Sequence, residues 1–155
     1  MELKQVLVGL DESEAAAAAA RWAAEAVRAS GGEVLAVYGL DTSVPRLAAD
    51  SLLSGLGVPP SDIHNWREEI RHLLEDRWSQ PLREAGVPYR TVVVEGDSVH
   101  ALLQTARDND VDLIVVGHEG GTTFLHRLFK RVSEELIDHA SRPVVVVPFH
   151  PSDGA

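Results

Sequence analysis

The chain of 155 residues carries a formal net charge of -10 at pH 7, with 45% hydrophobic and 25% charged residues and no cysteine. This balance is typical of a globular domain, and it excludes a disulfide framework, a thiolate metal site and a cysteine nucleophile. The negative charge disfavours nucleic acid and anionic membranes as partners, and no apolar run is long enough to span a bilayer. We therefore expect a cytoplasmic protein with a single domain over residues 1–150 and a flexible tail over 151–155.

Short β-branched segments alternate with longer helical patterns along the chain. This alternation is typical of βαβ units and predicts a doubly wound α/β fold with a parallel sheet and helices on both faces. Most strand candidates are continuous apolar runs, as expected when helices cover both faces of a strand. Five strands are predicted: Gln5–Gly9, Glu33–Tyr38, Tyr89–Val94, Leu113–Gly117 and Val144–Val147.

The first helix is predicted to begin after Asp11-Glu12-Ser13. The Ser13 hydroxyl can cap the free amides of its first turn, and the neighbouring acids oppose the positive end of the helix dipole. Gly31-Gly32 provides a stop. The alanines between these signals suit close packing of the helix on a sheet.

Three further helical regions are predicted. In Ser61–Ala85 apolar residues recur at helical spacing, Pro81 should kink or restart the helix, and both tryptophans are expected in the core. The other two helices are predicted at Asp97–Arg107 and around Val132–Ala140. The stretch Thr42–Pro60 has weak periodicity and is predicted to be a loop or lid that contains a short helix.

Ligands of an open parallel sheet bind outside the carboxyl ends of its strands, where the strand order reverses. The segment Gly9–Ser13 follows the first strand, has no glycine-rich fingerprint, and carries two carboxylates where a pyrophosphate would need bare amides. Asp11 could accept hydrogen bonds from a ribose or a base, or it could simply cap the first helix. Taken alone, this residue favours the capping role.

The segment Gly117–Thr123, which follows the fourth strand, combines glycines with hydroxyls and could cradle an anion. Residues 117–131 carry Arg127, Lys130 and Arg131 against the single acid Glu119, in a chain that is otherwise acidic. This basic island could attract an anionic ligand. Its side chains could equally decorate a loop or pair with acids elsewhere.

Four segments, in this order and at this spacing, resemble the universal stress protein family. They are Val6–Ser13, Asp112–Gly117, Val132–Ala140 and Arg142–Pro148, and the resemblance covers Gln5 to Pro148. It implies a strand order of 3-2-1-4-5, dimerisation and, in many members, adenine-nucleotide binding at the end of the fourth strand.

The phosphate motif of that family is a glycine, two residues, a second glycine, nine residues, and then a glycine followed by serine or threonine. Gly117 and Gly120 match its first half, whereas Lys130 and Arg131 stand where the second half has glycine and a hydroxyl residue. Their long side chains could fill the pocket, or their charges could replace lost amide contacts by pairing with phosphate. The sequence leaves both outcomes open.

The resemblance implies that Asp11 lies near the ribose and Val37 or its neighbourhood near the base. It places Gly117, Gly120 and Val132 around the phosphates. The predicted ligand is ATP or another adenine nucleotide, with or without Mg²⁺. The predicted nucleotide site comprises Asp11, Val37, Gly117, His118, Gly120, Gly121, Lys130, Arg131, Val132 and Ser133.

The sequence offers no catalytic or metal motif: it has no HExxH pair, no GxSxG elbow and no P-loop. His118 beside Glu119 is the one pair near the predicted site that could carry a proton. We expect no enzymatic activity beyond incidental slow ATP hydrolysis. Two hypotheses follow: a nucleotide-binding regulator, or a nucleotide-free module that engages protein clients.

The last predicted strand, Val144–Val147, is apolar on both faces, and the strand order implied by the resemblance puts it at an edge of the sheet. An open apolar edge is an aggregation hazard, which pairing across a two-fold axis would remove. We therefore expect a homodimer built on this strand.

Overall fold

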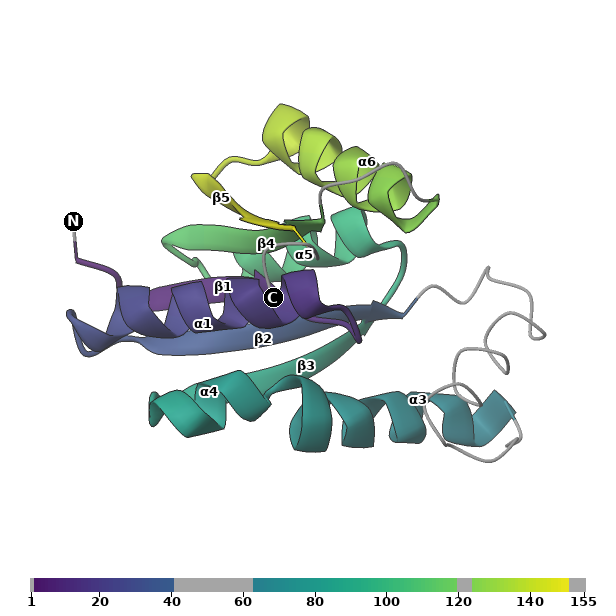
Figure 1. Ribbon diagram of the computed structural model, residues 1–155, viewed down its shortest axis with the longest axis horizontal. Coiled ribbons are helices and arrows are strands. Elements are labelled where there is room, and N and C mark those ends of the chain that lie inside the picture. The colour runs from purple at the N-terminus through teal and green to yellow at the C-terminus, as the bar shows by residue number, and fades with distance from the viewer. Residues whose placement is uncertain (1, 41–62, 120–123, 151–155) are drawn as a thin grey trace.

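A computed structural model describes residues 2–40, 63–119 and 124–150, and for 63–66 and 124–131 only the course of the backbone. Five parallel strands form one sheet in the order β3-β2-β1-β4-β5 (Figure 1). The predicted α/β class and strand order are confirmed. The predicted lid Thr42–Pro60 lies outside the described residues, as do Gly120 and Gly121. The strands are β1 (Gln5–Gly9), β2 (Glu33–Leu40), β3 (Tyr89–Glu95), β4 (Leu113–Glu119) and β5 (Val144–Phe149).

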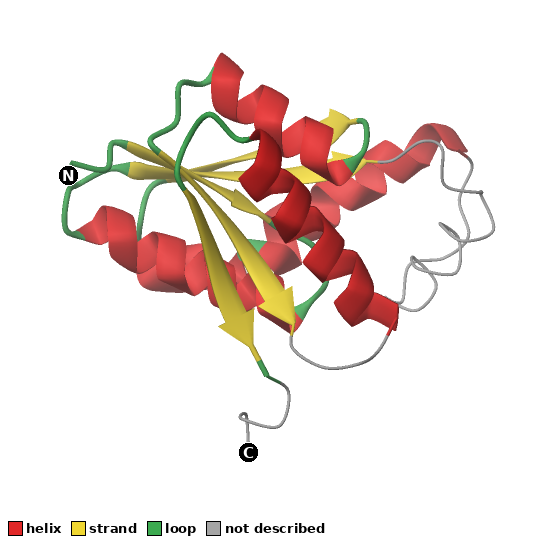
Figure 2. Cartoon of the chain, turned by 90° about the horizontal axis from the view of Figure 1, so that it is seen from above, coloured by secondary structure: helices red, strands yellow, loops and turns green. Residues whose placement is uncertain are grey.

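Helices cover both faces of the sheet (Figure 2). One face, here called the α1 face, carries α1 (Glu14–Arg28), α3 (Ile63–Leu73), the π-helical turn η1 (Leu74–Trp78) and α4 (Gln80–Ala85). The other, the α5 face, carries α5 (Ser98–Asp108) and α6 (Phe124–His139). None of the helices that the structure describes is long and apolar enough to cross a membrane.

The sheet separates two apolar clusters, because successive side chains of a strand point to opposite faces. In β1, Val6 and Val8 pack on the α1 face, whereas Leu7 packs on the α5 face. In β5, Val145 and Val147 pack against the first cluster, and Val144 and Val146 against the second. This two-sided burial explains why the strands are continuous apolar runs.

Helix α1 begins as predicted. The Ser13 hydroxyl accepts a hydrogen bond from the Ala16 amide at 3.1 Å, so Ser13 is the N-cap. The helix buries a stripe of small side chains that lets its axis approach the sheet closely. It ends at Arg28, and Gly31 then takes a φ of +69°, which favours glycine.

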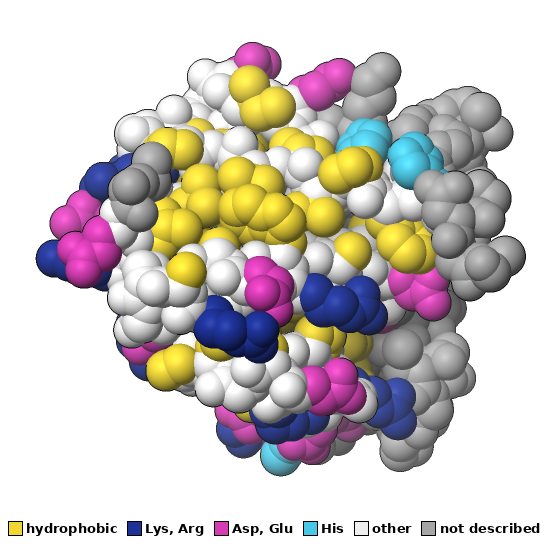
Figure 3. Space-filling model, turned by 60° about the vertical axis from the view of Figure 1, so that its left-hand side comes forward, with side chains coloured by type: hydrophobic (Ala, Val, Ile, Leu, Met, Phe, Trp, Pro, Cys, Tyr) yellow, Lys and Arg dark blue, Asp and Glu magenta, His cyan; other side chains and the backbone are white. Residues whose placement is uncertain are grey.

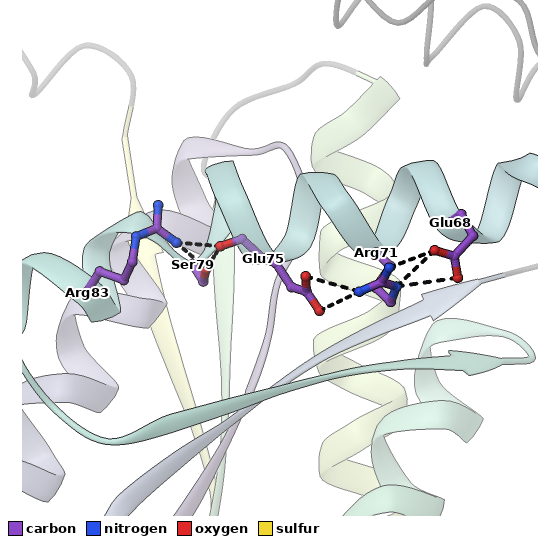
Figure 4. A network of polar contacts seen from close by, with 5 residues as sticks. All are labelled: Glu68, Arg71, Glu75, Ser79 and Arg83. Atoms are coloured by element: carbon purple, nitrogen blue, oxygen red, sulfur yellow. Dashed lines mark hydrogen bonds and ion pairs between the residues drawn. The ribbon is translucent and has the colours of Figure 1, made fainter.

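Pro81 restarts the second helical region, as predicted, and a π-helical turn precedes it. In the π turn the Ser79 amide donates to the Leu74 carbonyl at 3.1 Å, so the Glu75 carbonyl needs other donors. The Ser79 hydroxyl donates to the Glu75 carbonyl at 2.6 Å, and the Arg83 guanidinium donates to Ser79 Oγ at 2.9 Å and to the same Glu75 carbonyl (Figure 4).

Two predicted boundaries differ from the structure in an informative way. The fourth helix was predicted around Val132–Ala140, but α6 begins eight residues earlier, at Phe124. The fourth strand was predicted to end at Gly117, but it runs on to Glu119, where it pairs with Phe149 of β5. Part of the predicted anion loop is therefore strand, and the basic island lies on a helix. Of the two expected core tryptophans, Trp78 is buried beside Tyr38 with ring centroids 5.3 Å apart, and the side chain of Trp66 lies outside the described part of the chain.

Candidate functional site

The candidate site lies where the strand order reverses, between β1 and β4 (Figure 2). The chain continues from β1 to α1 on one face and from β4 to α6 on the other, so the elements that follow these two strands diverge here. Asp11 follows β1, and Gly117 lies near the end of β4. In such folds this divergence opens a crevice at the carboxyl ends of the strands.

Asp11 organises the start of α1. Its Oδ1 accepts hydrogen bonds from the Ser13 amide at 2.8 Å and from the Ser13 hydroxyl at 2.5 Å. Asp11 thus orients the residue that caps the helix, which agrees with the capping role that this residue alone favours. Burial raises the pKa of the Asp11 carboxyl, and the hydrogen bonds from Ser13 offset only part of that rise.

Glu12 adds a second acid at this end of the sheet. Burial raises the pKa of its carboxyl, and the negative charge of Asp11 raises it further. Two carboxylates that already repel each other would repel phosphate groups placed beside them. An anionic part of a ligand is therefore expected away from the start of α1.

Replacing Asp11 with asparagine should change how stability depends on pH. A carboxyl whose pKa is raised by folding holds a proton that the unfolded chain releases, so its contribution to stability is lost as pH rises. The stability of Asp11→Asn relative to wild type should therefore increase from about pH 4, near the ordinary pKa of aspartate, toward neutral pH. Urea unfolding at several pH values measures this difference.

Asp138→Asn, an exposed change on α6, is the control for the altered net charge. If Asp11→Asn became less stable than wild type as pH rose over the same range, the pKa shift would have the opposite sign.

Gly117 has a structural role that the sequence pattern did not reveal. A Cβ built on Gly117 would lie 2.2 Å from the carbonyl oxygen of Ala15 in the first turn of α1. No side chain fits there, so glycine allows β4 and α1 to touch backbone to backbone. The contact also brings the end of β4 next to the helix that Asp11 orients.

His118 and Glu119 are adjacent in β4 and face opposite sides of the sheet. Strand alternation turns His118 to the α5 face, as it does Val116, and turns Glu119 to the α1 face. Their side chains therefore lie on opposite sides of the sheet. The proton-carrying arrangement that their adjacency suggested is not supported by this geometry.

Val37 belongs to the core rather than to a surface that a ligand could touch. Its side chain is buried on the α5 face, and its carbonyl accepts a hydrogen bond from the Leu10 amide at 2.9 Å.

Gly39 lies two residues after Val37 in β2, so its peptide groups point to the same side of the strand, toward β1. Because β1 ends at Gly9, these groups face the space beyond β1. A Cβ on Gly39 would lie 2.9 Å from the Ser98 Cα, so this glycine is required by packing. The sequence did not identify Gly39 as a site residue, because a single glycine in a strand is a weak indication of function.

The second half of the phosphate motif falls inside α6. Lys130, Arg131, Val132 and Ser133 lie well beyond the first turn of this helix, which begins at Phe124. Their amides are within the repeat of intrahelical hydrogen bonds and so cannot serve a phosphate. Val132 packs against the α5-face core and Ser133 is buried. Among the helical residues of α6, the amides without intrahelical acceptors are those of residues 124–126.

The described residues contain no group of three or more His, Asp or Glu side chains that could hold a metal ion. The site is thus built from backbone groups and one oriented carboxylate. Such a set binds through hydrogen bonds to hydroxyls, heterocycles and anions.

Known proteins are similar to this chain over most of its length. A model of the universal stress protein family matches residues 2–148. A universal stress protein of Methanocaldococcus jannaschii is 28% identical over 151 residues, covering 93% of this chain and 81% of that protein. A universal stress protein of Mycobacterium tuberculosis is 30% identical over 148 residues, and this chain spans about half of its length, 46%.

Solved structures show the same fold. The universal stress protein of Archaeoglobus fulgidus in complex with dAMP has a TM-score of 0.64 at 20% identity, covering 95% of this chain and 99% of that one. A universal stress protein family member of Arabidopsis thaliana with AMP bound has a TM-score of 0.63 at 18% identity, covering 98% and 96%. With the match to the family model over nearly every residue, these likenesses lead to one conclusion: the chain belongs to the universal stress protein family.

Proposed function

We propose that this protein is a cytoplasmic regulator that binds an adenine nucleotide at the carboxyl ends of β1, β2 and β4. The observation that carries the proposal is the crevice position, where an oriented Asp11 and the outward peptide groups of Gly39 face one ligand space. Support comes from relatives of the same fold, which are complexes with dAMP and AMP.

Each part of the ligand has a partner in this proposal. Asp11 uses Oδ1 to hold Ser13, and we assign its Oδ2 to the ribose hydroxyls. The peptide of Gly39 pairs with the edge of the base. The phosphates lie beyond Gly117 at the amino end of α6, where unpaired amides and the helix dipole favour anions. Gly120 and Gly121 precede this helix in the sequence.

Lys130 and Arg131 would contribute through their side chains, because their amides are used within α6. Their positive charges would then bind the phosphates in place of the backbone and hydroxyl contacts that the glycine and the serine or threonine of the family motif provide. ATP or a related nucleotide, with or without Mg²⁺, fits this charge. His118 stays near the site as a neighbour on the α5 face, and Val132 and Ser133 hold α6 in place.

The double variant Lys130→Gly and Arg131→Ser tests this assignment. We expect it to weaken ATP binding about tenfold, or about 1.4 kcal/mol, and to flatten the dependence of affinity on salt. Titration calorimetry at two salt concentrations measures both. Lys130→Ala with Arg131→Ala is the matched control, since it removes the charges and keeps good helix propensity.

The two variants separate the possible outcomes. If the long side chains fill the pocket, both variants should bind ATP more tightly than wild type. Unchanged affinity and salt dependence in both would remove Lys130 and Arg131 from the site.

The proposed role is regulation by binding, with ATP hydrolysis at most slow and incidental. In the second candidate function, a dimeric module binds protein clients without a nucleotide. The observation that favours it is partly exposed apolar surface: the valines of β5 are only half-buried, and Trp22 of α1 is 40% exposed. Figure 3 shows apolar side chains gathered in a broad patch bordered by charged ones.

We further propose that the protein is a homodimer built on β5. The Ile114 amide donates to the Pro143 carbonyl at 3.0 Å, so the Pro143 carbonyl points toward β4. Because the direction of the peptide groups alternates along the strand, those of Val144 and Val146 point away from β4. In the described part of the chain, β5 is the last strand of the sheet and has no neighbour on that side. A second copy related by a two-fold axis can pair with these groups.

Val146→Pro should convert the dimer to a monomer at micromolar concentration. The substitution removes the outward amide of Val146 and leaves the ladder between β4 and β5 intact, because that amide does not face β4. Val146→Lys should have the same effect by placing a charge in an apolar contact. Light scattering measures the mass, with Val146→Thr as a control that keeps the amide. A wild-type monomer, or a dimer unaffected by both changes, would contradict the proposal.

A further inference from the structure

The sheet has two unlike edges, β3 and β5 (Figure 1). The Val34 amide donates to the Pro88 carbonyl at 2.9 Å, and the Gly96 amide donates to the Leu40 carbonyl at 2.9 Å. Peptide groups alternate in direction along a strand, so those of Thr91 and Val93 point away from β2, toward the outer side of β3. On both edge strands, the peptide groups of every second residue point away from the sheet: those of Thr91 and Val93 on β3, and those of Val144 and Val146 on β5. Because this spacing is the same, the two edges could form hydrogen bonds with each other.

A side chain from α3 covers the β3 edge. Arg67 Nη2 donates to the carbonyl of Val93 at 3.3 Å, and its Nη1 lies 2.7 Å from Glu95 Oε1. The guanidinium therefore occupies the Val93 carbonyl, which points away from β2, and it is held in place by the Glu95 carboxylate at the end of the same strand. Among the described residues, β5 ends the sheet on the opposite side.

The exposure of this ion pair indicates that its role is not stability. The side chains of Arg67 and Glu95 are 53% and 59% exposed, and exposed pairs contribute little to folding. A charge placed on an edge strand is, however, a recognised means of preventing another strand from joining it.

The two edges have different consequences for assembly. Pairing of β5 with β5 across a two-fold axis closes after two copies, whereas pairing of β5 with the β3 edge of the next copy is head-to-tail and can continue into a fibre. We propose that Arg67 prevents the β5 edge of a second copy of this chain from pairing with the β3 edge. It would thereby limit assembly. The inference concerns the same β5 edge that pairs in the proposed dimer, but it does not require that dimer to form.

Arg67→Ala tests the proposal by sedimentation velocity on the full chain between micromolar and hundred-micromolar concentration. We expect species larger than wild type that grow with concentration, and a melting temperature equal to that of wild type. Arg71→Ala is the matched control. Arg71 is also an arginine of α3, but it pairs with Glu68 at 2.7 Å and with Glu75 at 3.0 Å along its own helical region (Figure 4). This variant should keep the wild-type size.

A second variant shows which edge joins. Adding Val146→Pro to Arg67→Ala should return the protein to small species, because the invading edge has lost its donor. Arg67→Ala with a wild-type size distribution, or fibres that persist with Val146→Pro, would overturn the proposal. If Arg67→Ala disturbs folding, Arg67→Gln, which keeps the stem and removes the charge, must give the same larger species. A wild-type monomer would contradict the proposed dimer alone and leave this test valid.

Discussion

Gly117→Ala should lower the free energy of unfolding by about 3 kcal/mol or more, at the upper end of overpacking effects. The added methyl would lie 2.2 Å from the Ala15 carbonyl oxygen and 2.9 Å from the Ala16 amide nitrogen. Both are backbone atoms of a capped helix, so they cannot turn away as a side chain can. Urea unfolding followed by circular dichroism measures the loss.

Gly9→Ala is the matched control, since it adds the same methyl group near the end of the neighbouring strand β1. Its Cβ would lie 3.3 Å from a methyl carbon of Leu102, a side chain that can shift. We expect a cost below about 1.5 kcal/mol. Equal losses for the two variants would mean that the contact between β4 and α1 is not the cause.

Ile114→Ala should cost about 2–5 kcal/mol, the range for large-to-small changes in a well-packed core. Ile114 is fully buried in β4, which lies between β1 and β5, and its side chain belongs to the α5-face cluster. Rigid strands on both sides limit how far the cavity can collapse. Thermal and urea unfolding measure the effect.

Ile137→Ala makes the same chemical change on α6, where the side chain is 60% exposed. Its cost should stay within about 0.5 kcal/mol, as for most surface substitutions. A large loss at Ile137 would show that this residue is covered in solution, and would identify it as part of an interface.

The positions of strands and layers could be predicted because burial on both faces leaves continuous apolar runs. The limits of β1 were predicted correctly, since Gly9 and Leu10 are followed by the polar residues Asp11, Glu12 and Ser13. The end of β4 could not be predicted, because Gly117 resembles a loop residue until its pairing with Val147 is known. The start of α6 was missed because its charged residues suggested a loop, although Phe124, Leu125, Leu128 and Phe129 repeat at helical spacing.

The candidate site was predictable as a region but not residue by residue. The carboxyl end of a strand can be located from sequence, whereas the direction of its peptide groups depends on the ladder phase with its neighbour. Val37 and Gly39 share the same phase, and they differ because the Leu10 amide uses the Val37 carbonyl whereas Gly39 lies beyond the last pair of β1 with β2. Likewise, only the approach of Ala15 shows that Gly117 is required by packing.

Nucleotide binding is tested most directly by thermal unfolding of the purified protein, first stripped of any bound nucleotide that acid extraction reveals, with increasing ATP, AMP or dAMP. A ligand that binds only the folded state adds about 2.7 kcal/mol at a hundredfold excess over its dissociation constant. We expect the melting temperature to rise steadily with at least one adenine nucleotide and to stay constant with guanosine or free phosphate at the same concentrations. A melting temperature unchanged up to millimolar adenine nucleotide, with none extracted from the native protein, would contradict the proposed function.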